Sequence, residues 1–300
     1  MPELPEVETI VRDLKKKVIG KVFIDVWTDF EKTIRVPAAL GRKERGSQFQ
    51  KFKKYLKGKT IKDIERRGKN ILINLSQGKT LLIHQKLTGH LLFGRWEQKE
   101  GKWQSKIAGP LADDPKNRFL HVVFFFKDDS QLALSDLRKF AKIELWDKKE
   151  LENSKGFKGL GPEPLEKNFT FENFQKIIQK KRAKIKQVLM DQNVIAGIGN
   201  IYSDEILWRA RVHPLKEASK LSTKELKDIF FAIKELLPKA IRLGGESMSD
   251  FRTLSGEKGL FDKERKVYRK EGEKCPRCPG KIKRIKIGSR SAHFCPSCQK

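Results

Sequence analysis

The first 274 of the 300 residues contain no cysteine, because all four cysteines fall in the last 26 positions. Disulfides normally staple small secreted domains, so this distribution excludes a disulfide framework along the chain. Long apolar runs are also missing. The longest strongly apolar run, residues 122–126, is far too short to span a bilayer. The start is acidic and lacks the apolar stretch of a signal peptide, so we expect a cytoplasmic protein with no membrane partner.

Acidic residues are scarce beside basic ones. Lys and Arg number 66 and Asp and Glu 38, which leaves a net charge of +28 spread along the chain. A surface of this kind favours a polyanion, and nucleic acid is the leading candidate. A generally lysine-rich proteome would give the same excess without a specific ligand. The length and the 38% hydrophobic content predict two domains with real cores and a small appendage.

Hydrophobic spacing divides the chain into a β-rich half and a helical half. Apolar residues at helical spacing over 7–18, followed by Gly20, predict a helix at the N-terminus. Short β-rich runs with turn dipeptides then predict a sandwich or barrel. We expect strands over 22–28, 70–75, 80–85, 121–126 and 131–135, turns at 77–78 and 128–129, and a long exposed loop over 94–115.

A Gly- and Pro-rich bridge over 156–164 predicts a linker, after which the pattern becomes helical. Thr170 caps one predicted helix, and two more are expected over about 183–191 and 201–212. A longer helix begins at the capping box of Ser222 and Glu225 and continues to about residue 243.

The cysteines have the spacing of a metal site. Two CxxC pairs, Cys275 with Cys278 and Cys295 with Cys298, are separated by sixteen residues. Four thiolates at this spacing predict one structural zinc ion. The surrounding segment is basic and has no acidic residue from position 274 onward, so it is suited to phosphate. Two disulfides, or a ribbon used only for stability, are the alternatives. His293 lies off the ligand spacing and is predicted to be a packing or surface residue.

The N-terminus has the elements of a nucleophile. Removal of Met1 would leave Pro2 with a free secondary amine beside the carboxylate of Glu3. A free α-amine loses its proton far more readily than a lysine ammonium, so it can attack an electrophilic carbon and form an iminium. Glu3 could then act as the acid. An ordinary surface terminus that begins with proline is the alternative.

Three other segments stand out. Gly197 and Gly199 precede Asn200, which opens a predicted helix whose free N–H groups could hold a phosphate. A tight turn with a helix cap would look the same. Lys69 lies in a turn between strands, where a solvated lysine is the ordinary case. Arg138 and Phe140 follow a predicted strand, where a strand end with a buried Phe is equally ordinary.

Together these segments resemble a known family. The start PELPEVET (2–9), the segment LMDQNVIAGIGNIYSDEIL (189–207) and the cysteine motif resemble bacterial formamidopyrimidine-DNA glycosylases, over nearly the whole chain. The resemblance implies a multidomain α+β fold: an N-terminal β-sandwich domain led by a helix (1–152), a helical domain with a helix–two-turn–helix motif (165–265) and a C-terminal zinc ribbon (266–300).

The resemblance also implies an activity, a partner and roles for single residues. The activity is excision of oxidised purines followed by strand cleavage through β- and δ-elimination. The partner is double-stranded DNA with oxidised bases or abasic sites, bound by a monomer. Pro2 would be the nucleophile, Glu3 the acid on the sugar and Glu6 a second acid. Lys69 and Arg290 would touch phosphates and assist elimination.

The implied DNA contacts come from both halves of the chain. Lys181, Lys186 and Asn200 would contact the phosphates and the lesion. Leu87, Arg138 and Phe140 would fill the gap left by the flipped base, as apolar wedges do elsewhere. Leu87 stands where the family usually has methionine, a residue of similar volume. Phe119 stands near a position where histidine or tyrosine is common, so a DNA contact there is left open.

Two other functions are compatible with parts of this pattern. One is an endonuclease VIII-like enzyme for oxidised pyrimidines, although PELPEVET differs from the PEGPE-type start of that family. The other is a zinc-ribbon nucleic-acid-binding protein without catalysis, against which the intact pair of Pro2 and Glu3 argues.

Overall fold

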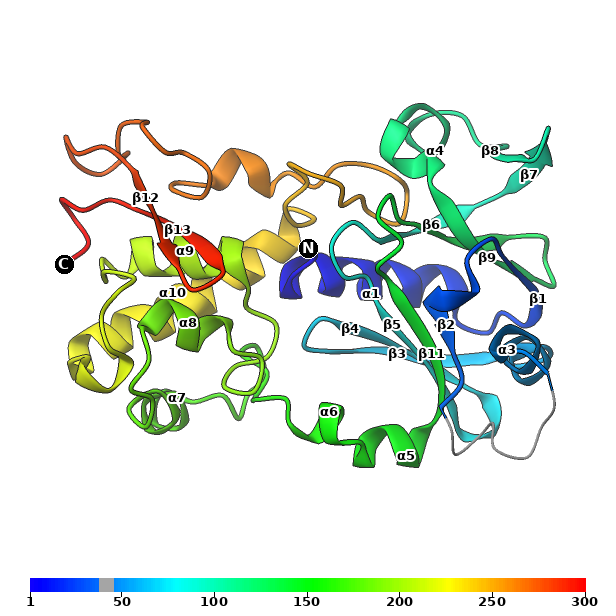
Figure 1. The fold of residues 1–300 in the computed structure, drawn as a ribbon, viewed down its shortest axis with the longest axis horizontal. Helices are drawn as coiled ribbons and strands as arrows, with labels where there is room; N and C mark the ends of the chain where they lie inside the picture. Colours follow the sequence, from blue (N-terminus) through cyan, green and yellow to red (C-terminus); the bar gives the residue numbers. More distant parts are fainter. Residues whose placement is uncertain (38–45) are drawn as a thin grey trace. The chain divides into compact units, whose positions relative to one another are not determined.

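The computed structural model describes residues 1–37 and 46–300, which form two compact units (Figure 1). Unit 1 comprises 1–158 and 244–260, and unit 2 comprises 159–243 and 261–300. The boundary at 158 falls within the predicted linker. The sequence-based boundaries assign 244–260 to the helical domain, whereas the structure places it in unit 1. Long-range hydrogen bonds are the reason, such as the one from Phe93 N to Leu254 O (2.9 Å).

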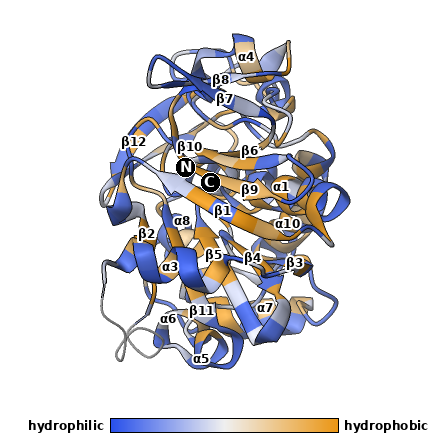
Figure 2. Cartoon of the chain, turned by 90° about the vertical axis from the view of Figure 1, so that its right-hand side faces the viewer, coloured by the Kyte–Doolittle hydropathy of each residue, from blue (hydrophilic) through white to orange (hydrophobic). Residues whose placement is uncertain are grey.

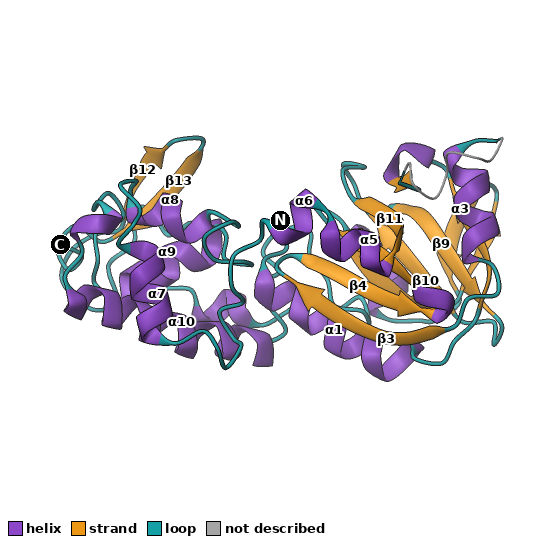
Figure 3. Ribbon diagram, turned by 90° about the horizontal axis from the view of Figure 1, so that it is seen from below, coloured by secondary structure: helices purple, strands orange, loops and turns teal. Residues whose placement is uncertain are grey.

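Unit 1 begins with helix α1 (Leu4–Val18), as predicted. A capping box of Glu3 and Glu6 starts the helix, and Pro5 is accommodated in its first turn, where no N–H is needed. Gly20 takes a φ of 83° just beyond the end of the helix. The apolar face of α1 is buried, and the helix packs along β3 (Ile61–Arg67) and β4 (Asn70–Leu75), as Figure 3 shows.

Two sheets form the sandwich of unit 1. One has the strand order β1 (Phe23–Thr28), β9 (Leu120–Phe126), β10 (Gln131–Ser135) and β6 (His90–Gly94). The other has the order β2 (Ile34–Arg35), β11 (Lys142–Asp147), β5 (Lys79–His84), β4 and β3. The strands of both sheets pair antiparallel except for the parallel pair of β2 and β11. Their inward side chains form one apolar core together with α1, and Figure 2 shows apolar residues along β1, β5 and β9. The predicted β-sandwich and all five predicted strands are therefore confirmed. The other described elements of this part of unit 1 are α3 (Gln48–Leu56), α5 (Lys148–Asn153), α6 (Lys155–Lys158) and the short helices η1 (Glu31–Thr33), η2 (Ser76–Gly78) and η3 (Pro115–Arg118).

The prediction of a long exposed loop over 94–115 is wrong. The segment holds a hairpin, β7 (Trp96–Lys99) with β8 (Lys102–Ser105), and a short helix, α4 (Pro110–Asp113). Its tryptophans anchor it. Trp96 is buried and its backbone N–H donates to Gln131 Oε1 at 2.5 Å, while Trp103 packs edge-on against Trp27 at 5.2 Å between ring centroids.

Unit 2 is helical with a terminal β-ribbon. The helices are α7 (Phe171–Ile178), α8 (Ile185–Met190), α9 (Asn200–Arg209) and α10 (Thr223–Arg242), with η4 (Ala218–Lys220) and η5 (Phe261–Glu264); the ribbon is β12 (Lys283–Ile287) with β13 (Arg290–Phe294). The predicted caps are confirmed: the Thr170 side chain accepts from Asn173 N, and Ser222 and Glu225 form a capping box. None of the described helices combines the length and the apolarity that crossing a membrane requires.

Candidate active site and metal centre

Three loops of unit 1 meet at one end of the five-stranded sheet. The antiparallel register pairs Arg67 with Asn70, Ile71 with Ile83, and Lys142 with His84. These strand ends therefore bring three loops together: the β3–β4 turn, the β5–β6 loop (85–89) and the β10–β11 loop (136–141). The three loops carry four of the predicted site residues: Lys69, Leu87, Arg138 and Phe140.

The chain terminus opens into the same region. A cavity of about 510 Å³ is lined by Met1, the apolar side chains of Leu87 and Phe140, and four lysines. The lysines are Lys32, Lys86, Lys139 and Lys142. The structure thus brings together the predicted nucleophile end of the chain, two predicted wedge residues and a cluster of positive charge suited to phosphate.

Pro2, Glu3 and Glu6 are buried at the start of α1, with Glu3 2% and Glu6 1% exposed. Glu3 N donates to Glu6 Oε2 at 2.7 Å, and the Glu3 side chain accepts from Glu6 N. The other oxygen of Glu6 accepts from Glu246 N at 2.8 Å. Glu6 therefore ties the predicted catalytic terminus to the 244–260 segment, a positioning role that the sequence did not indicate.

Gly245 makes this approach possible. Its φ is 80°, and a Cβ placed there would lie 2.8 Å from Glu6 Oε1. A side chain at this position would push the 244–260 segment away from the carboxylate.

Lys69 is not the solvated turn lysine that its sequence position allows, because its residue is only 7% exposed. It follows Gly68, whose φ of 57° suits the two-residue hairpin loop. The charge of Lys69 acts on His84, at the end of β5. The pKa of His84 is lowered to about 3, mainly by burial and then by the positive charges of Lys86 and Lys69. Lys69 therefore lies close to the end of β5, next to the loop that carries Leu87.

The residues before the two wedge side chains are strained. Lys86 and Lys139 have φ values of 55° and 56°, a left-handed region that favours glycine, and each directly precedes a wedge residue, Leu87 or Phe140. Such strain is held where the surroundings enforce it and is concentrated at functional sites. The Arg138 guanidinium carbon lies 4.6 Å from the Phe140 ring centroid, so these two predicted gap-fillers contact each other.

Asp136 and Thr88 hold the two strained loops together. Asp136 is 1% exposed; it accepts from the Thr88 hydroxyl, and Oδ2 accepts from Ala141 N at 2.8 Å. Thr88 Oγ1 in turn accepts from Arg138 N at 3.1 Å. Asp136 N donates to Phe119 O at 2.9 Å, which places Phe119 beside the same loop. Sequence reasoning missed Asp136, although an acidic residue directly after a buried strand was a signal.

Gln85 is a second residue that sequence reasoning missed. It is 1% exposed, and among the described residues neither polar atom of its side-chain amide has a hydrogen-bond partner. Only its position at the end of β5, two residues before Leu87, could have indicated it.

In unit 2, α8, a turn and α9 form the predicted helix–two-turn–helix unit. Asn200 is the first residue of α9, and Gly197 takes a φ of 93° in the turn. Asn200 Oδ1 is buried, and no hydrogen bond to it is found within 1–37 and 46–300. Lys181 is exposed just before α8. The open end of α9 and a nearby exposed cation are compatible with a phosphate contact.

Lys186 does not fit the predicted DNA contact. Its side chain is 1% exposed, and Nζ lies 2.5 Å from Asp204 Oδ1 and 3.0 Å from Ser203 Oγ. Asp204 Oδ2 accepts from His293 N at 2.9 Å and lies 3.0 Å from His293 Nδ1. Lys186 is therefore committed to a buried network that joins α8, α9 and β13. His293, predicted to pack rather than to bind metal, belongs to the same network.

Arg290 is exposed at the start of β13, directly after the ribbon's turn. The turn lies against α8, because a Cβ built on Gly288 would be 3.3 Å from Gln187 Nε2.

Glu205 of α9 accepts hydrogen bonds from the backbone N–H groups of Lys266, Val267 and Tyr268. Burial raises the pKa of Glu205 despite these bonds.

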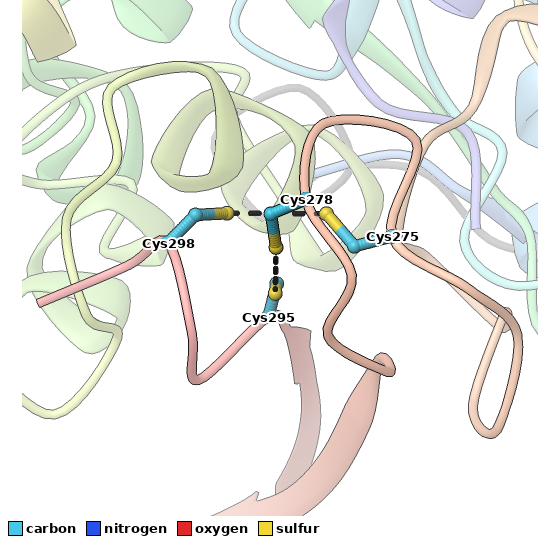
Figure 4. A group of neighbouring side chains, drawn as sticks. All are labelled: Cys275, Cys278, Cys295 and Cys298. Atoms are coloured by element: carbon cyan, nitrogen blue, oxygen red, sulfur yellow. Dashed lines mark hydrogen bonds between the residues drawn. The ribbon is translucent and has the colours of Figure 1, made fainter.

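The four cysteines converge as a metal site (Figure 4). Their sulfur atoms lie within 4.8 Å of one another, with 3.4 Å between Cys278 and Cys295 and 3.9 Å between Cys275 and Cys298. A disulfide needs about 2.05 Å, so the disulfide alternative is excluded. A tetrahedral zinc–thiolate centre separates its sulfurs by about 3.8 Å. The residues therefore fit one zinc ion.

Helix α9 reaches this centre through Trp208. Burial raises the pKa of Cys275, but the neighbouring Trp208 side chain and the Arg277 backbone outweigh it and lower the pKa to about 6. Trp208 packs with Val267, Ile282 and the cysteines in one small apolar cluster.

A β-sandwich headed by a buried Pro-Glu terminus, a helix–two-turn–helix unit and a four-thiolate ribbon define the class of this protein. Its sequence matches three family descriptions: "Formamidopyrimidine-DNA glycosylase N-terminal domain" over 1–143, "Formamidopyrimidine-DNA glycosylase H2TH domain" over 160–252, and "Zinc finger found in FPG and IleRS" over 272–300.

Whole-chain relatives agree with these matches. The formamidopyrimidine-DNA glycosylase of Pelotomaculum thermopropionicum is 40% identical over 300 residues, covering all of this chain and 99% of the relative. A crystal structure of the Lactococcus lactis enzyme, a point mutant bound to Fapy-dG-containing DNA, superposes with a TM-score of 0.83 at 34% identity, with full coverage of both chains. The same enzyme with abasic-site DNA gives 0.83 at 34% identity and 99% coverage of each. The chain belongs to the formamidopyrimidine-DNA glycosylase family.

Proposed function

We propose that this protein is a base-excision repair glycosylase that removes oxidised purines, 8-oxoguanine and formamidopyrimidines, and then cleaves the strand as an AP lyase. One observation carries the proposal: Met1, which directly precedes the buried Pro2 and Glu3, lines a cavity that is also lined by Leu87, Phe140 and four lysines. Structural neighbours bound to Fapy-dG, abasic-site and carbocyclic 8-oxo-G DNA support this choice of substrate.

The chemistry follows from a free Pro2 amine. The nitrogen attacks C1′ of the damaged nucleotide, and the C1′–N bond to the base breaks as the base leaves with its electron pair. Glu3 gives a proton to the ring oxygen, so the C1′–O4′ bond opens and an iminium forms between Pro2 and C1′. Loss of a C2′ proton then expels the 3′ phosphate, and loss of the C4′ proton in a second elimination expels the 5′ phosphate. Water finally releases the amine.

The surrounding residues hold the DNA for this reaction. Leu87, Arg138 and Phe140 fill the space vacated by the flipped nucleotide, which lowers the cost of its extrusion. Lys69 neutralises phosphate beside the sugar. Lys181, Asn200 and Arg290 grip phosphates from unit 2, and the zinc ion holds the ribbon that presents Arg290. The enzyme works as a monomer on the chromosome in the cytoplasm.

Borohydride trapping tests the proposal. Reduction fixes only an enzyme that has formed an iminium, so protein shown by mass spectrometry to begin at Pro2 should become covalently attached to 8-oxoguanine DNA. The matched control is protein that retains Met1, in which Pro2 nitrogen is a tertiary amide without basicity. It should bind DNA but not be trapped. Trapping of the Met1 form would overturn the proposed nucleophile.

The substrate class is tested by a second pair of substrates. Duplexes with 8-oxoguanine should be cleaved much faster than duplexes with thymine glycol. The reverse order would indicate an endonuclease VIII-like activity, and trapping on neither would indicate a DNA-binding protein without catalysis.

A further inference from the structure

The indole of Trp208 has a buried N–H group that lacks a conventional partner. Trp208 lies in α9 and is 7% exposed, packed against Cys275, Cys295 and Ile282. In the described chain its Nε1 makes no hydrogen bond of normal geometry. A buried donor without an acceptor is costly, so an acceptor is expected among the groups that surround the indole.

The buried cluster around Trp208 offers one kind of acceptor. Its other members are Val267, Ile282 and the four cysteines, and among these side chains only the sulfur atoms can accept a hydrogen bond. The direction of the Cys275 pKa shift agrees, because the Trp208 side chain lowers that pKa. A zinc ion with four thiolates carries two net negative charges, and in a largely buried site these charges need nearby donors.

Arg277 fixes the indole in this place. Its guanidinium carbon lies 3.9 Å from the Trp208 ring centroid, and Nη1 donates to Trp208 O at 2.8 Å. The guanidinium therefore adds positive charge beside the thiolates and holds both the ring and the end of α9. Because Arg277 lies between Cys275 and Cys278 in the sequence, the first CxxC knuckle is attached directly to the helix.

We propose that Trp208 is a positioning residue of the metal centre, whose indole N–H donates a hydrogen bond to the Cys275 thiolate once zinc is bound. This contact couples α9, the helix that begins at Asn200, to the ribbon that presents Arg290. The inference concerns the zinc site and does not depend on glycosylase activity.

The rate of zinc release from the full-length protein tests the proposed hydrogen bond between Trp208 and Cys275. Trp208→Phe should lose zinc to the chromogenic chelator 4-(2-pyridylazo)resorcinol about tenfold or more faster than the wild type, in the range found for residues that support metal ligands. Trp103→Phe is the matched control. The Trp103 indole nitrogen is likewise buried without a hydrogen bond in the described chain, but it lies in the β7–β8 hairpin of unit 1. Its zinc release should be unchanged.

Cobalt substitution separates the hydrogen bond from simple packing. The bond stabilises sulfur lone pairs, so its loss should move the thiolate-to-cobalt charge-transfer band to lower energy. Replacing Trp208 by 3-benzothienyl-alanine keeps the ring's shape but substitutes sulfur for the N–H, and it should reproduce both changes. If this variant has wild-type spectrum and zinc release, Trp208 acts only by packing and the proposal is overturned.

Discussion

The N-terminal end of unit 1 and the ribbon of unit 2 hold their functional groups by different means. In unit 1, the carboxylates of Glu3 and Glu6 accept backbone N–H groups, and a core built from both sheets and α1 surrounds them. In the ribbon, four thiols face one another beside a small apolar cluster. The comparison teaches that the proposed catalytic end is organised by folding itself, whereas the proposed phosphate-gripping end is organised by metal.

Loss of one zinc ligand should give the largest effect and separates the two ends most sharply. Structural zinc in finger peptides contributes an apparent binding free energy of about 10–16 kcal/mol, which is also folding energy. Cys298→Ser should lose its zinc ion and unfold the ribbon, while the sandwich keeps its own thermal transition. Zinc analysis and calorimetry measure both.

The contrary outcome is equally clear. A Cys298→Ser protein that lacks zinc but keeps full DNA affinity would show that the ribbon is a stabilising staple only. Loss of the sandwich transition as well would show that unit 1 depends on the metal, against the comparison.

Glu3→Gln probes the acid at the other end. Glutamine keeps the size of the side chain and an oxygen that can accept from Glu6 N, but it cannot deliver a proton. Base excision should fall by about 10²–10⁴-fold, the usual contribution of a positioned acid. Cleavage of a preformed abasic site, from which no base has to leave, should fall less. Equal losses on the two substrates would assign Glu3 to structure or to placement of Pro2.

Acid should weaken unit 1 through His90. This side chain is 1% exposed, and Nε2 lies 2.9 Å from Asn117 Oδ1. Burial lowers its pKa to about 4, although hydrogen bonds to Asn117 and Thr88 oppose the shift. Between pH 6.5 and 4, His90 is therefore protonated in the unfolded chain and neutral in the folded chain. Stability is complete above pH 6.5 and falls as the pH drops, by up to about 3 kcal/mol.

His90→Gln removes this titration. Urea denaturation at several pH values should show a stability slope over pH 4.5–6 that is shallower by about one proton, or about 1.4 kcal/mol per pH unit. An unchanged slope would mean that His90 does not set this acid sensitivity.

Much of this organisation could be predicted because its causes are local. The helix over 4–18 follows from its apolar spacing and from Gly20, the hairpin turns from their dipeptides, and the metal site from cysteine spacing alone. The Trp-containing hairpin over 96–105 was missed because its two strands are short and mostly polar, and its anchors lie elsewhere in the chain.

Long-range pairings explain the other differences. Glu6 meets Glu246 across 240 positions, which brings 244–260 into unit 1. Lys186 is buried because Asp204, eighteen positions away, balances its charge and Ser203 accepts another of its hydrogen bonds. No local pattern distinguishes such a lysine from a solvated one, so the sequence supported a DNA contact that the fold does not.

Arg290→Ala should produce the smallest effect and tests the phosphate-gripping half of the comparison with the metal in place. Arg290 is exposed and lies beside the ribbon turn, opposite Ile287, so its removal should leave the zinc content unchanged. Each phosphate contact releases about one counterion, so the slope of log affinity against log salt should fall by about 1. Lys283→Ala removes the same charge from the far end of the hairpin, opposite Phe294, and should change the slope less. Equal slopes for the two variants would mean that the ribbon contributes only diffuse charge, because a specific grip requires that position along the hairpin matter as well as charge.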